Sequence, residues 1–329
     1  MLGAGNWGTT LGLLLAEKHN EVMLWEFFPE REAELKKNRE NKRFLPGFPF
    51  PNNLLTTSSI SEAVKDKKII VFAVPSHTLR SVVKSASKYI TGEPLVVSVV
   101  KGIEEETLMR MSEVIRENLP SHFAENIVVL SGPSIANEVA KKMPTTVVAA
   151  GKNIEKCREV QRVFSSSFFR IYTNEDIIGV ELGGSLKNVI VIAAGICDGM
   201  GLGANTKAAL LTRGLTEIKR LGVKMGAREI TFSGLSGIGD LITTAFSRDS
   251  RNRYVGEELG KGRKLSEILE GMVMVAEGIK TTHSAMQLAR KMDVDMPITS
   301  EVYNVLFKDK KPEEGVYDLM KRELKHENW

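Results

Sequence analysis

The chain of 329 residues is long enough for two domains that each bury a hydrophobic core. Hydrophobic residues make up 42% and charged residues 26%, which is the composition of an ordinary soluble protein. The chain has 45 lysines and arginines and 41 acidic residues. Because the net charge is therefore only +4, we expect no nucleic-acid partner. The local basic run at residues 36–43 is typical of a solvated helix face.

Cysteine usage and hydropathy exclude further classes of protein. Cys157 and Cys197 lie far apart without metal-ligand spacing, so we predict neither a disulfide framework nor a metal site. The longest apolar run, residues 189–196, is far shorter than the ~20 residues that a membrane-spanning helix needs. We therefore expect a cytoplasmic protein with no signal peptide and no membrane span.

The first half of the chain alternates short apolar runs with amphipathic stretches. Helical patterns at residues 9–18 and 104–118 fall between runs that predict strands at 22–25, 69–74, 95–99, 127–130 and 145–149. These runs are continuously apolar rather than alternating, as expected for a parallel sheet with helices on both faces. The pattern predicts a doubly wound α/β domain of the Rossmann type.

The second half of the chain has no strand signal after about residue 175. Helical periodicity continues from residue 180 onward, interrupted by glycine-rich breaks at 199–203, 234–239 and 260–262. We predict an all-helical second domain and divide the chain into residues 1–176 and 177–329.

The chain opens with Gly-Ala-Gly-Asn-Trp-Gly, in which Gly3, Gly5 and Gly8 have the G-x-G-x-x-G spacing. The first glycine permits a tight turn, the second lets the backbone approach a pyrophosphate, and the third packs helix against strand. The helix that follows offers free N–H groups to the phosphates of a dinucleotide. Only Met1 and Leu2 precede this fingerprint, where a strand of about five residues is expected. We expect from this that a few native residues before Met1 are absent.

An acidic residue stands where the fingerprint requires one. Glu26 follows the predicted strand at 22–25, in position to accept hydrogen bonds from the adenosine ribose and to repel a 2′-phosphate. The alternative is a solvated residue at the end of a strand. The first interpretation predicts NAD as the cofactor.

Several separated motifs occur in order along the chain. They are Gly3-Ala4-Gly5-Asn6-Trp7-Gly8-Thr9, Phe44-Leu45-Pro46-Gly47, Val71-Phe72-Ala73-Val74-Pro75-Ser76, Lys101-Gly102, Ser131-Gly132-Pro133-Ser134, Glu181-Leu182-Gly183-Gly184-Ser185-Leu186-Lys187-Asn188, Gly239-Asp240-Leu241 and Ser250-Arg251-Asn252-Arg253. Together they resemble the NAD(P)-dependent glycerol-3-phosphate dehydrogenases of the soluble bacterial type, over essentially the whole chain. The resemblance implies reduction of dihydroxyacetone phosphate to sn-glycerol 3-phosphate, usually for phospholipid synthesis. It also implies a site in the cleft between a Rossmann domain and a helical domain.

Lys187 is the predicted general acid/base. It stands alone in the apolar helical stretch 182–196, where partial burial would lower the pKa of its amine. The alternative is a lysine that extends from a core helix to solvent. Hydride delivery to a ketone builds negative charge on the carbonyl oxygen, which a positioned lysine can protonate.

Asp240 begins a predicted helix, and its local sequence is equally typical of a helix N-cap. The resemblance places Asp240 against Lys187 and the substrate, with Thr244 one turn further along. It also places Lys101, at the end of the strand 95–99, beside the substrate and the nicotinamide. The alternative is that Lys101 is an exposed lysine in a loop. The opposing effects of burial and a nearby carboxylate leave the direction of the Lys187 pKa open.

The Ser250-Arg251-Asn252 block is the predicted anchor for a substrate phosphate, because it offers a guanidinium fork, an amide and a hydroxyl at a helix start. The alternative is a solvated polar loop. The resemblance implies substrate contacts from Lys101, Gly132, Ser134, Lys187, Asp240, Ser250, Arg251 and Asn252. The fingerprint, the residues after the strand at 22–25 and the resemblance together predict cofactor contacts from Gly3, Gly5, Asn6, Trp7, Gly8, Glu26, Phe27, Lys101, Ala136, Arg251, Val275 and Glu277. Phe44, Pro75 and Ser76 are weaker candidates, and plain packing is the alternative role of Phe44.

The residues after the predicted strand at 22–25 bear on the choice between NAD and NADP. Bacterial relatives often carry arginines there, whereas this chain reads Glu26-Phe27-Phe28 with Arg31 as the nearest arginine. We therefore predict NAD, with NADP as the alternative. A dehydrogenase of the 3-hydroxyisobutyrate or 6-phosphogluconate type and a non-catalytic dinucleotide sensor are the competing functions. The expected partners are a small phosphorylated substrate and, as a prediction from resemblance, a second copy in a homodimer.

Overall fold

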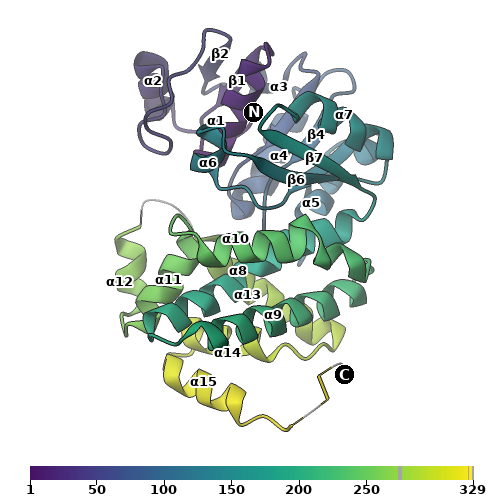
Figure 1. The fold of residues 1–329 in the computed structure, drawn as a ribbon. Coiled ribbons are helices and arrows are strands. Elements are labelled where there is room, and N and C mark those ends of the chain that lie inside the picture. The colour runs from purple at the N-terminus through teal and green to yellow at the C-terminus, as the bar shows by residue number, and fades with distance from the viewer. Residues whose placement is uncertain (273–275, 325, 328–329) are drawn as a thin grey trace.

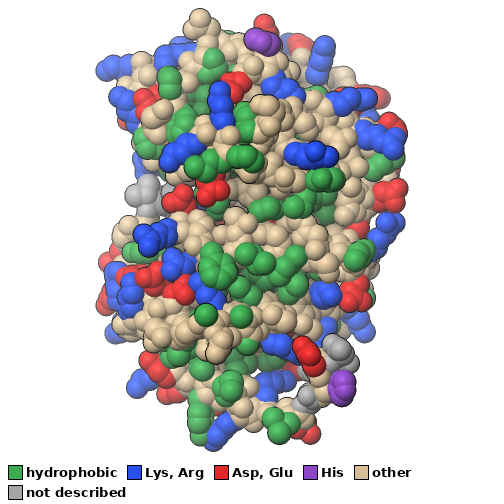
Figure 2. Space-filling view, viewed as in Figure 1, with side chains coloured by type: hydrophobic (Ala, Val, Ile, Leu, Met, Phe, Trp, Pro, Cys, Tyr) green, Lys and Arg blue, Asp and Glu red, His purple; other side chains and the backbone are tan. Residues whose placement is uncertain are grey.

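The computed structural model describes residues 1–272, 276–324 and 326–327. A sheet-containing domain forms one half of the molecule and a helical domain the other (Figure 1). On the face drawn in Figure 2, acidic and basic side chains intermingle over both halves, as a net charge of +4 leads one to expect.

The strands of the first domain form one sheet. Their bounds are β1 (Val22–Trp25), β2 (Leu54–Thr57), β3 (Ile69–Phe72), β4 (Leu95–Ser98), β5 (Ile127–Ser131), β6 (Thr145–Ala150) and β7 (Phe169–Asn174). β1 pairs with β2, and β3 to β7 pair in chain order. Leu2 joins the two groups, because its backbone forms parallel bridges to both Trp25 and Phe72. The fingerprint therefore leaves the middle of the sheet, where ligands of doubly wound folds bind.

The predicted strands are all present, but the prediction of a fully parallel sheet is wrong at one position. β6 runs antiparallel to β5, whereas the other pairs of strands are parallel. β2 and β7 were not predicted. In β7, buried Phe169 and Ile171 alternate with exposed Arg170 and Tyr172, the pattern of a half-covered strand rather than a continuous apolar run.

The helices of the first domain cover both faces of this sheet (Figure 1). They are α1 (Asn6–Glu17), α2 (Pro29–Asn38), α3 (Ile60–Val64), η1 (Ser76–Thr78), α4 (Leu79–Ser87), α5 (Met111–Asn118), η2 (Ser121–Asn126), α6 (Ala136–Ala140) and α7 (Ile154–Phe164). The helix predicted at 104–118 begins only at Met111. Leu108 has a φ of +61°, a left-handed conformation that a continuous helix cannot contain.

The second domain is helical throughout its described part, as predicted. Its elements are α8 (Ile177–Gly199), α9 (Ala204–Lys224), η3 (Glu229–Ser233), η4 (Leu235–Gly239), α10 (Asp240–Phe246), α11 (Arg251–Gly260), α12 (Leu265–Glu270), α13 (Glu277–Met292), α14 (Pro297–Phe307) and α15 (Pro312–Met320). The glycine-rich breaks predicted at 199–203 and 260–262 fall at the ends of α8 and α11, whereas the one predicted at 234–239 is itself the short helical turn η4.

Helix α8 is the centre of the helical domain. It is long and apolar enough to cross a membrane, with a mean hydropathy of 1.6, but 94% of this stretch is buried inside the protein. Helices α9, α10, α11, α13 and α14 pack against it, and it also carries the buried charged residues Glu181 and Lys187. Its apolar surface is therefore satisfied by protein contacts rather than by lipid.

A buried carboxylate on α9 makes the stability of this domain depend on pH. Both oxygens of Glu217 cap the start of α14, accepting from the backbone N–H of Ile298 at 2.6 Å and of Thr299 at 3.1 Å. Burial raises the pKa of Glu217 to about 7, against the opposing effect of these hydrogen bonds. Because the folded pKa exceeds the unfolded value, the favourable contribution is complete at low pH and is lost as pH rises through 7.

We predict that ionisation of Glu217 lowers the free energy of unfolding by about 2 kcal/mol between about pH 5 and about pH 8. Glu217→Gln removes this part of the pH dependence while retaining one acceptor for the helix. Calorimetric melting of both proteins across this range measures the difference. Glu229→Gln, at an exposed glutamate, is the matched control; an identical pH dependence in wild type and Glu217→Gln would refute the assignment.

Candidate active site

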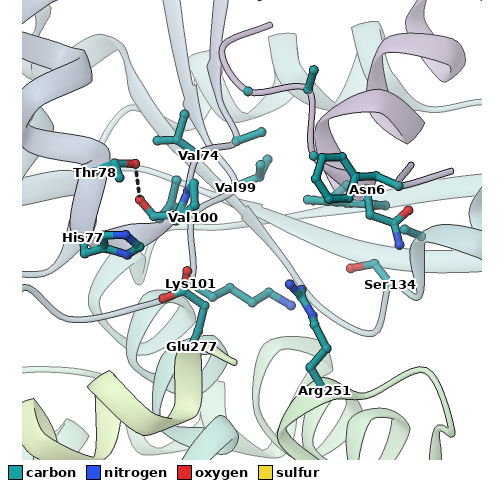
Figure 3. Close-up of a pocket in the computed structure, with 18 of the residues that line it drawn as sticks. Asn6, Val74, His77, Thr78, Val99, Val100, Lys101, Ser134, Arg251 and Glu277 are labelled. Carbon is teal, nitrogen blue, oxygen red and sulfur yellow. Dashed lines mark hydrogen bonds between the residues drawn. The ribbon is translucent and has the colours of Figure 1, made fainter. Parts of the chain in front are cut away.

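A cavity of about 690 Å³ lies between the two domains. Its walls come from the fingerprint, the ends of β1, β3 and β4, the start of α6, the middle of α8 and the starts of α10, α11 and α13. Figure 3 shows Lys101 and Arg251 extending toward each other across this space, with Asn6 and Ser134 along one wall.

The fingerprint forms a turn that leaves room for a ligand. Gly3 has a φ of +114°, and a Cβ there would lie 2.7 Å from the carbonyl oxygen of Ala73. A Cβ at Gly8 would lie 2.0 Å from the oxygen of Gly3, so helix α1 could not pack this closely with any other residue. At Gly5, by contrast, a Cβ would have no atom within 4 Å and would face open space. The three glycines therefore have the different roles expected of a dinucleotide cradle.

Two further observations at the start of α1 point to a polar ligand. No side chain caps this 12-residue helix, because its N-cap position is Gly5. The buried Oδ1 of Asn6 has no hydrogen-bond partner, although buried polar atoms in proteins are nearly always paired. Free N–H groups at a helix start favour an anion such as a pyrophosphate.

Glu26 directly follows β1. It is only 7% exposed and lines the cavity, so the interpretation as a solvated strand-end residue is wrong. Its Oε1 accepts from the backbone N–H of Phe28 at 3.2 Å, which fixes the carboxylate at the cavity wall. Arg31 also lines the cavity, and its guanidinium lies 4.1 Å above the ring of Phe28.

The polar centre of the cavity is a cluster around the carboxylate of Asp240. Its Oδ1 lies 2.8 Å from Nζ of Lys187, and its Oδ2 lies 2.6 Å from Nζ of Lys101. Lys187 also donates to Oγ1 of Thr244, whose hydroxyl in turn donates to the backbone oxygen of Asp240 at 2.7 Å. The side chains of Lys187 and Asp240 are 5% and 2% exposed. Lys187 therefore does not extend from the core into bulk solvent.

Burial lowers the pKa of Lys187 to about 8. Asp240 acts in the opposite direction by favouring the ammonium form, while the positive charges of Lys101 and Arg251 lower the pKa further. The net direction, which the sequence left open, is downward. An amine whose pKa lies near the pH of the solution can both donate and accept a proton.

The alternative role of Asp240 as a helix N-cap is wrong. Gly239 occupies the N-cap position of α10, and no side chain caps the helix there. The π-helical turn η4 leads directly into α10, so the first residue of this helix points its carboxylate at the lysines instead of at its own backbone.

The glycines of the Leu-Gly-Gly-Ser-Leu-Lys-Asn block explain how Lys187 reaches this cluster. A Cβ at Gly183 would lie 2.7 Å from the oxygen of Ser236, and one at Gly184 would lie 2.5 Å from Oγ of Ser131. α8 can thus approach both η4 and the end of β5. In the same turn, Oγ of Ser185 accepts from the N–H of Gly102 at 2.9 Å and so holds the loop that carries Lys101.

The start of α11 presents the predicted phosphate-binding side chains. Ser250 caps the helix, because its Oγ accepts from the N–H of Arg253 at 3.2 Å. Oδ1 of Asn252 accepts from the N–H of Gly278 at 2.9 Å, which ties this end of α11 to α13. Arg251 has no acidic partner within ion-pair distance in the described part of the chain, and its guanidinium points into the cavity (Figure 3).

Glu277 and Ser76 join the two domains at the edge of the cavity. The carboxylate of Glu277, at the start of α13, accepts from the backbone N–H of Ser76 at 3.2 Å and from its hydroxyl at 2.5 Å. Gly102 packs directly against this contact, because a Cβ at Gly102 would lie 2.5 Å from the Cβ of Ser76. The rim of the cavity is therefore built from both domains.

The structure brings together most of the residues predicted for the site. The cavity is lined by Gly3, Gly5, Asn6, Trp7, Glu26, Phe27, Phe44, Pro75, Lys101, Ser134, Ala136, Lys187, Asp240, Thr244, Ser250, Arg251, Asn252 and Glu277. Gly8 and Gly132 lie outside its lining. Gly8 packs helix against turn, and the carbonyl of Gly132 accepts from Nζ of Lys101 at 3.3 Å. Val275 lies outside the described residues.

Sequence reasoning missed several residues that shape the site. Nδ2 of Asn41 donates to the oxygen of Ala4 and to Oγ1 of Thr9, both at 2.8 Å, and Oδ1 accepts from the N–H of Phe44. One buried amide thus connects the fingerprint with the aromatic side of the cavity. Nothing in the local sequence distinguishes this asparagine, because all its partners are distant or backbone groups. Further unpredicted lining residues are His77, Thr78, Val99, Val100, Ile135, Asn188 and Asp249.

A dinucleotide cradle and a buried lysine–carboxylate pair that share one interdomain cavity define the class of two-domain nicotinamide-dependent dehydrogenases. Comparisons with known proteins identify the particular family. The two profiles described as the N-terminus and C-terminus of NAD-dependent glycerol-3-phosphate dehydrogenase match residues 1–157 and 176–317. The chain belongs to the NAD-dependent glycerol-3-phosphate dehydrogenase family.

Individual relatives are similar over the full length. The NAD(P)+ glycerol-3-phosphate dehydrogenase of Bacillus cytotoxicus is 50% identical over 327 residues, which cover 99% of this chain and 96% of the relative. The enzyme of the same description from Chlorobium phaeobacteroides is 51% identical, with 99% and 98% covered. The crystal structure of glycerol-3-phosphate dehydrogenase from Coxiella burnetii superimposes with a TM-score of 0.93 at 36% identity, covering 98% of each chain.

Proposed function

We propose that this chain reduces dihydroxyacetone phosphate to sn-glycerol 3-phosphate with a reduced nicotinamide dinucleotide, with Lys187 as the general acid/base. The observation that carries the proposal is the Lys187–Asp240–Thr244 cluster at the bottom of the cavity that also contains the fingerprint. The family membership of the chain supports the same reaction.

The fingerprint suits a dinucleotide on the chemistry of its own atoms. Gly5 opens onto free space, the start of α1 has no capping side chain, and the buried Oδ1 of Asn6 lacks a partner. These groups would hold the pyrophosphate and the neighbouring polar atoms. When bound, the reduced cofactor supplies a hydride to the ketone carbon of the substrate.

The protein's part in the reaction is to supply and control one proton. As the hydride adds to the carbonyl carbon, the C=O π electrons move to oxygen, and the Lys187 ammonium donates a proton to that oxygen. The product alcohol then carries one added hydride and one added proton, and Lys187 is left as a neutral amine. Asp240 stabilises the ammonium before transfer, and Thr244 orients Nζ through its hydroxyl.

Substrate binding depends on the cations near Asp240. Lys101 and Lys187 lie within ion-pair distance of its carboxylate, and Arg251 lines the same cavity. Arg251 and Asn252 offer a planar donor fork and an amide to the dianionic phosphate. Because Arg251 is not engaged in an ion pair among the described residues, its charge favours a phosphorylated ketone over a neutral one.

We predict that NADH is the better cofactor, with a kcat/KM about tenfold or more above that for NADPH, because the fixed Glu26 carboxylate repels a 2′-phosphate. Glu26→Gln should move this ratio toward NADPH by about tenfold. Steady-state kinetics with both cofactors measures the ratio. Glu30→Gln, at an exposed acid outside the cavity, is the matched control. An unchanged ratio in Glu26→Gln would show that Arg31 or another group decides the choice.

The direct test of the function is to follow NADH absorbance while dihydroxyacetone phosphate is added to the purified protein. Steady oxidation that requires the phosphorylated substrate supports the proposal. Oxidation only with 3-hydroxyisobutyrate-type or 6-phosphogluconate-type substrates would assign the chain to a different dehydrogenase. Binding of NADH without turnover of any of these substrates would favour the non-catalytic sensor.

The cellular setting and the assembly state are part of the proposal. The product is a glycerol phosphate suited to phospholipid synthesis, and both free cysteines are buried thiols, as in a reducing cytoplasm. A domain division between residues 176 and 177 is supported by α8, whose first turn is capped there by Asp176. We keep a homodimer as the predicted assembly, which light scattering on the purified protein would test.

A further inference from the structure

The helix that carries Arg251 and the helix that carries Lys187 touch backbone to backbone. A Cβ at Gly195 on α8 would lie 2.1 Å from the oxygen of Arg253, and one at Gly256 on α11 would lie 2.0 Å from the oxygen of Ile192. The glycines Gly199 and Gly260 repeat this contact one turn further along. α11 therefore lies in a shallow groove of α8, with no side chains between the two backbones.

This packing sets the distance between the helix axes. Because a Cβ at any of these four glycines would collide with the backbone of the partner helix, the packing also restricts sliding along the axes. The two helices run in the same direction, since Arg253 lies opposite Gly195 and Glu257 opposite Gly199. A displacement by one residue would move Arg251 by about 1.5 Å relative to Lys187.

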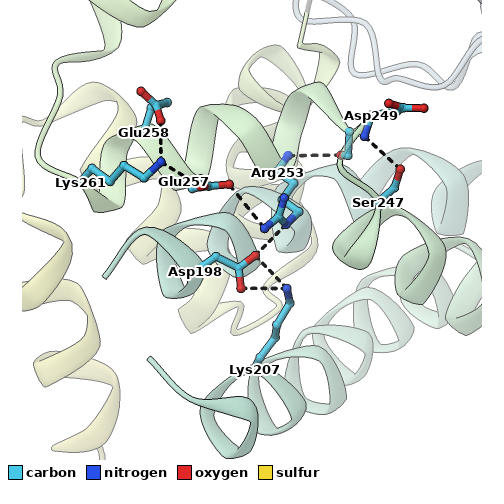
Figure 4. A network of polar contacts seen from close by, with 9 residues as sticks. Asp198, Lys207, Ser247, Asp249, Arg253, Glu257, Glu258 and Lys261 are labelled. Carbon is cyan, nitrogen blue, oxygen red and sulfur yellow. Dashed lines mark hydrogen bonds and ion pairs between the residues drawn. The ribbon is translucent and has the colours of Figure 1, made fainter. Parts of the chain in front are cut away.

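An ion-pair network adds side-chain contacts that hold the start of α11 in this position (Figure 4). Oδ2 of Asp198, near the end of α8, accepts from Nε of Arg253 at 2.7 Å. Lys207 on α9 holds the same carboxylate from the other side, with Nζ at 2.9 Å from Oδ1 and 2.8 Å from Oδ2. The side chains of Arg253 and Asp198 are both 19% exposed, and that of Lys207 is 10% exposed, so solvent screens the network only in part.

The network lies next to the site without lining the cavity. Arg253 is two residues after Arg251 on the same helix, and its own N–H is the group that Ser250 caps. Lys207 also lies 4.5 Å above the ring of Phe246, the last residue of the helix that begins with Asp240. The three charged residues thus connect α8 and α11, which carry Lys187 and Arg251, with the start of α9.

We infer that Arg253 is a positioning residue that, through Asp198 and Lys207, holds the start of α11 against α8 and so helps to set the distance between Lys187 and the phosphate-binding pair Arg251 and Asn252. This distance matches the enzyme to a ketone and a phosphate separated by one carbon. The inference rests on the proposed function and adds a determinant of substrate length to it.

The test compares dihydroxyacetone phosphate with its homologue that has one additional methylene between carbonyl and phosphate. In Arg253→Gln, KM for dihydroxyacetone phosphate should rise and the kcat/KM preference for the shorter substrate should fall by about tenfold, because a misplacement of about 1 Å can cost up to about 10²-fold in rate and the displacement here is smaller. KM for NADH and kcat at saturation should change far less. Arg263→Gln, which breaks an ion pair with Glu258 at the far end of α11, is the matched control and should keep the preference.

Two further variants separate positioning from general stability. Asp198→Asn should reproduce the loss of preference, and the double variant should be no worse than either single one, because both remove the same interaction. Arg253→Lys should restore part of the preference. If Arg253→Gln does not fold, Lys207→Met provides a second measurement, because it removes the other cation that holds Asp198.

Retention of the substrate preference in folded Arg253→Gln, even with a lower melting temperature, would overturn the inference, as would additive effects of the two single variants. Failure of the proposed function has a different signature. In that case wild-type protein would not oxidise NADH with either substrate.

Discussion

Lys187→Ala is expected to lower turnover of dihydroxyacetone phosphate by about 10²–10⁴-fold, while the affinity for NADH stays nearly unchanged. The reason is that Lys187 is the buried amine placed to protonate the carbonyl oxygen, whereas the fingerprint that would hold the dinucleotide lies on the other domain. Turnover is measured by NADH absorbance and affinity by fluorescence titration.

The variant should still fold, because loss of the Lys187 amine does not leave Asp240 unpaired. Lys101 remains 2.6 Å from Oδ2 of this carboxylate. Lys310→Ala is a matched control in the same domain, since Lys310 also pairs with carboxylates but lies outside the cavity. Full activity in Lys187→Ala would exclude Lys187 as the proton donor.

The pH profile is a second readout of the same group. Reduction requires the ammonium form, and the pKa of Lys187 is lowered to about 8, so the rate should be constant below this pH and fall above it. Asp240→Asn removes the charge that holds this pKa up, and the falling limb should then move to lower pH. A limb that stays in place would mean that another group titrates.

The periodicity of the sequence was sufficient to predict the strands of the sheet's interior and the change to an all-helical domain. Hydrophobic runs such as Ile69–Phe72 are buried on both faces, and this burial is what their composition reports. The direction of a strand has no comparable signal in the composition of the sequence. β6 has the same apolar composition as its parallel neighbours, and only the path of the chain through α6 turns it antiparallel to β5.

The residues of the site also differ in whether the local sequence could predict them. Lys187 could be singled out because a lone charged side chain in an apolar stretch is unusual, and Arg251 because it lies in a polar block at a helix start. The resemblance to the family then favoured the functional role of each over its structural alternative. Asn41 and Arg253 could not be assigned roles, because their partners lie 32 to 55 positions away and come together only in the folded chain. Long-range hydrogen bonds of this kind are invisible to local spacing.

Arg251→Ala is expected to raise KM for dihydroxyacetone phosphate by about 10–100-fold, with a smaller effect on kcat. Its guanidinium lines the cavity and has no carboxylate within ion-pair distance among the residues described, so it is free to bind the substrate phosphate. Loss of two charge-assisted hydrogen bonds to a dianion accounts for a penalty of this size.

The control and a second kinetic constant distinguish phosphate binding from other roles. Arg248→Ala removes a neighbouring arginine that is exposed and outside the cavity lining, and it should leave KM unchanged. Because Arg251 is also a predicted cofactor contact, KM for NADH is measured in parallel. A rise confined to dihydroxyacetone phosphate supports the phosphate assignment, whereas a rise confined to NADH would transfer Arg251 to the cofactor. A normal KM for both would remove it from the binding site altogether.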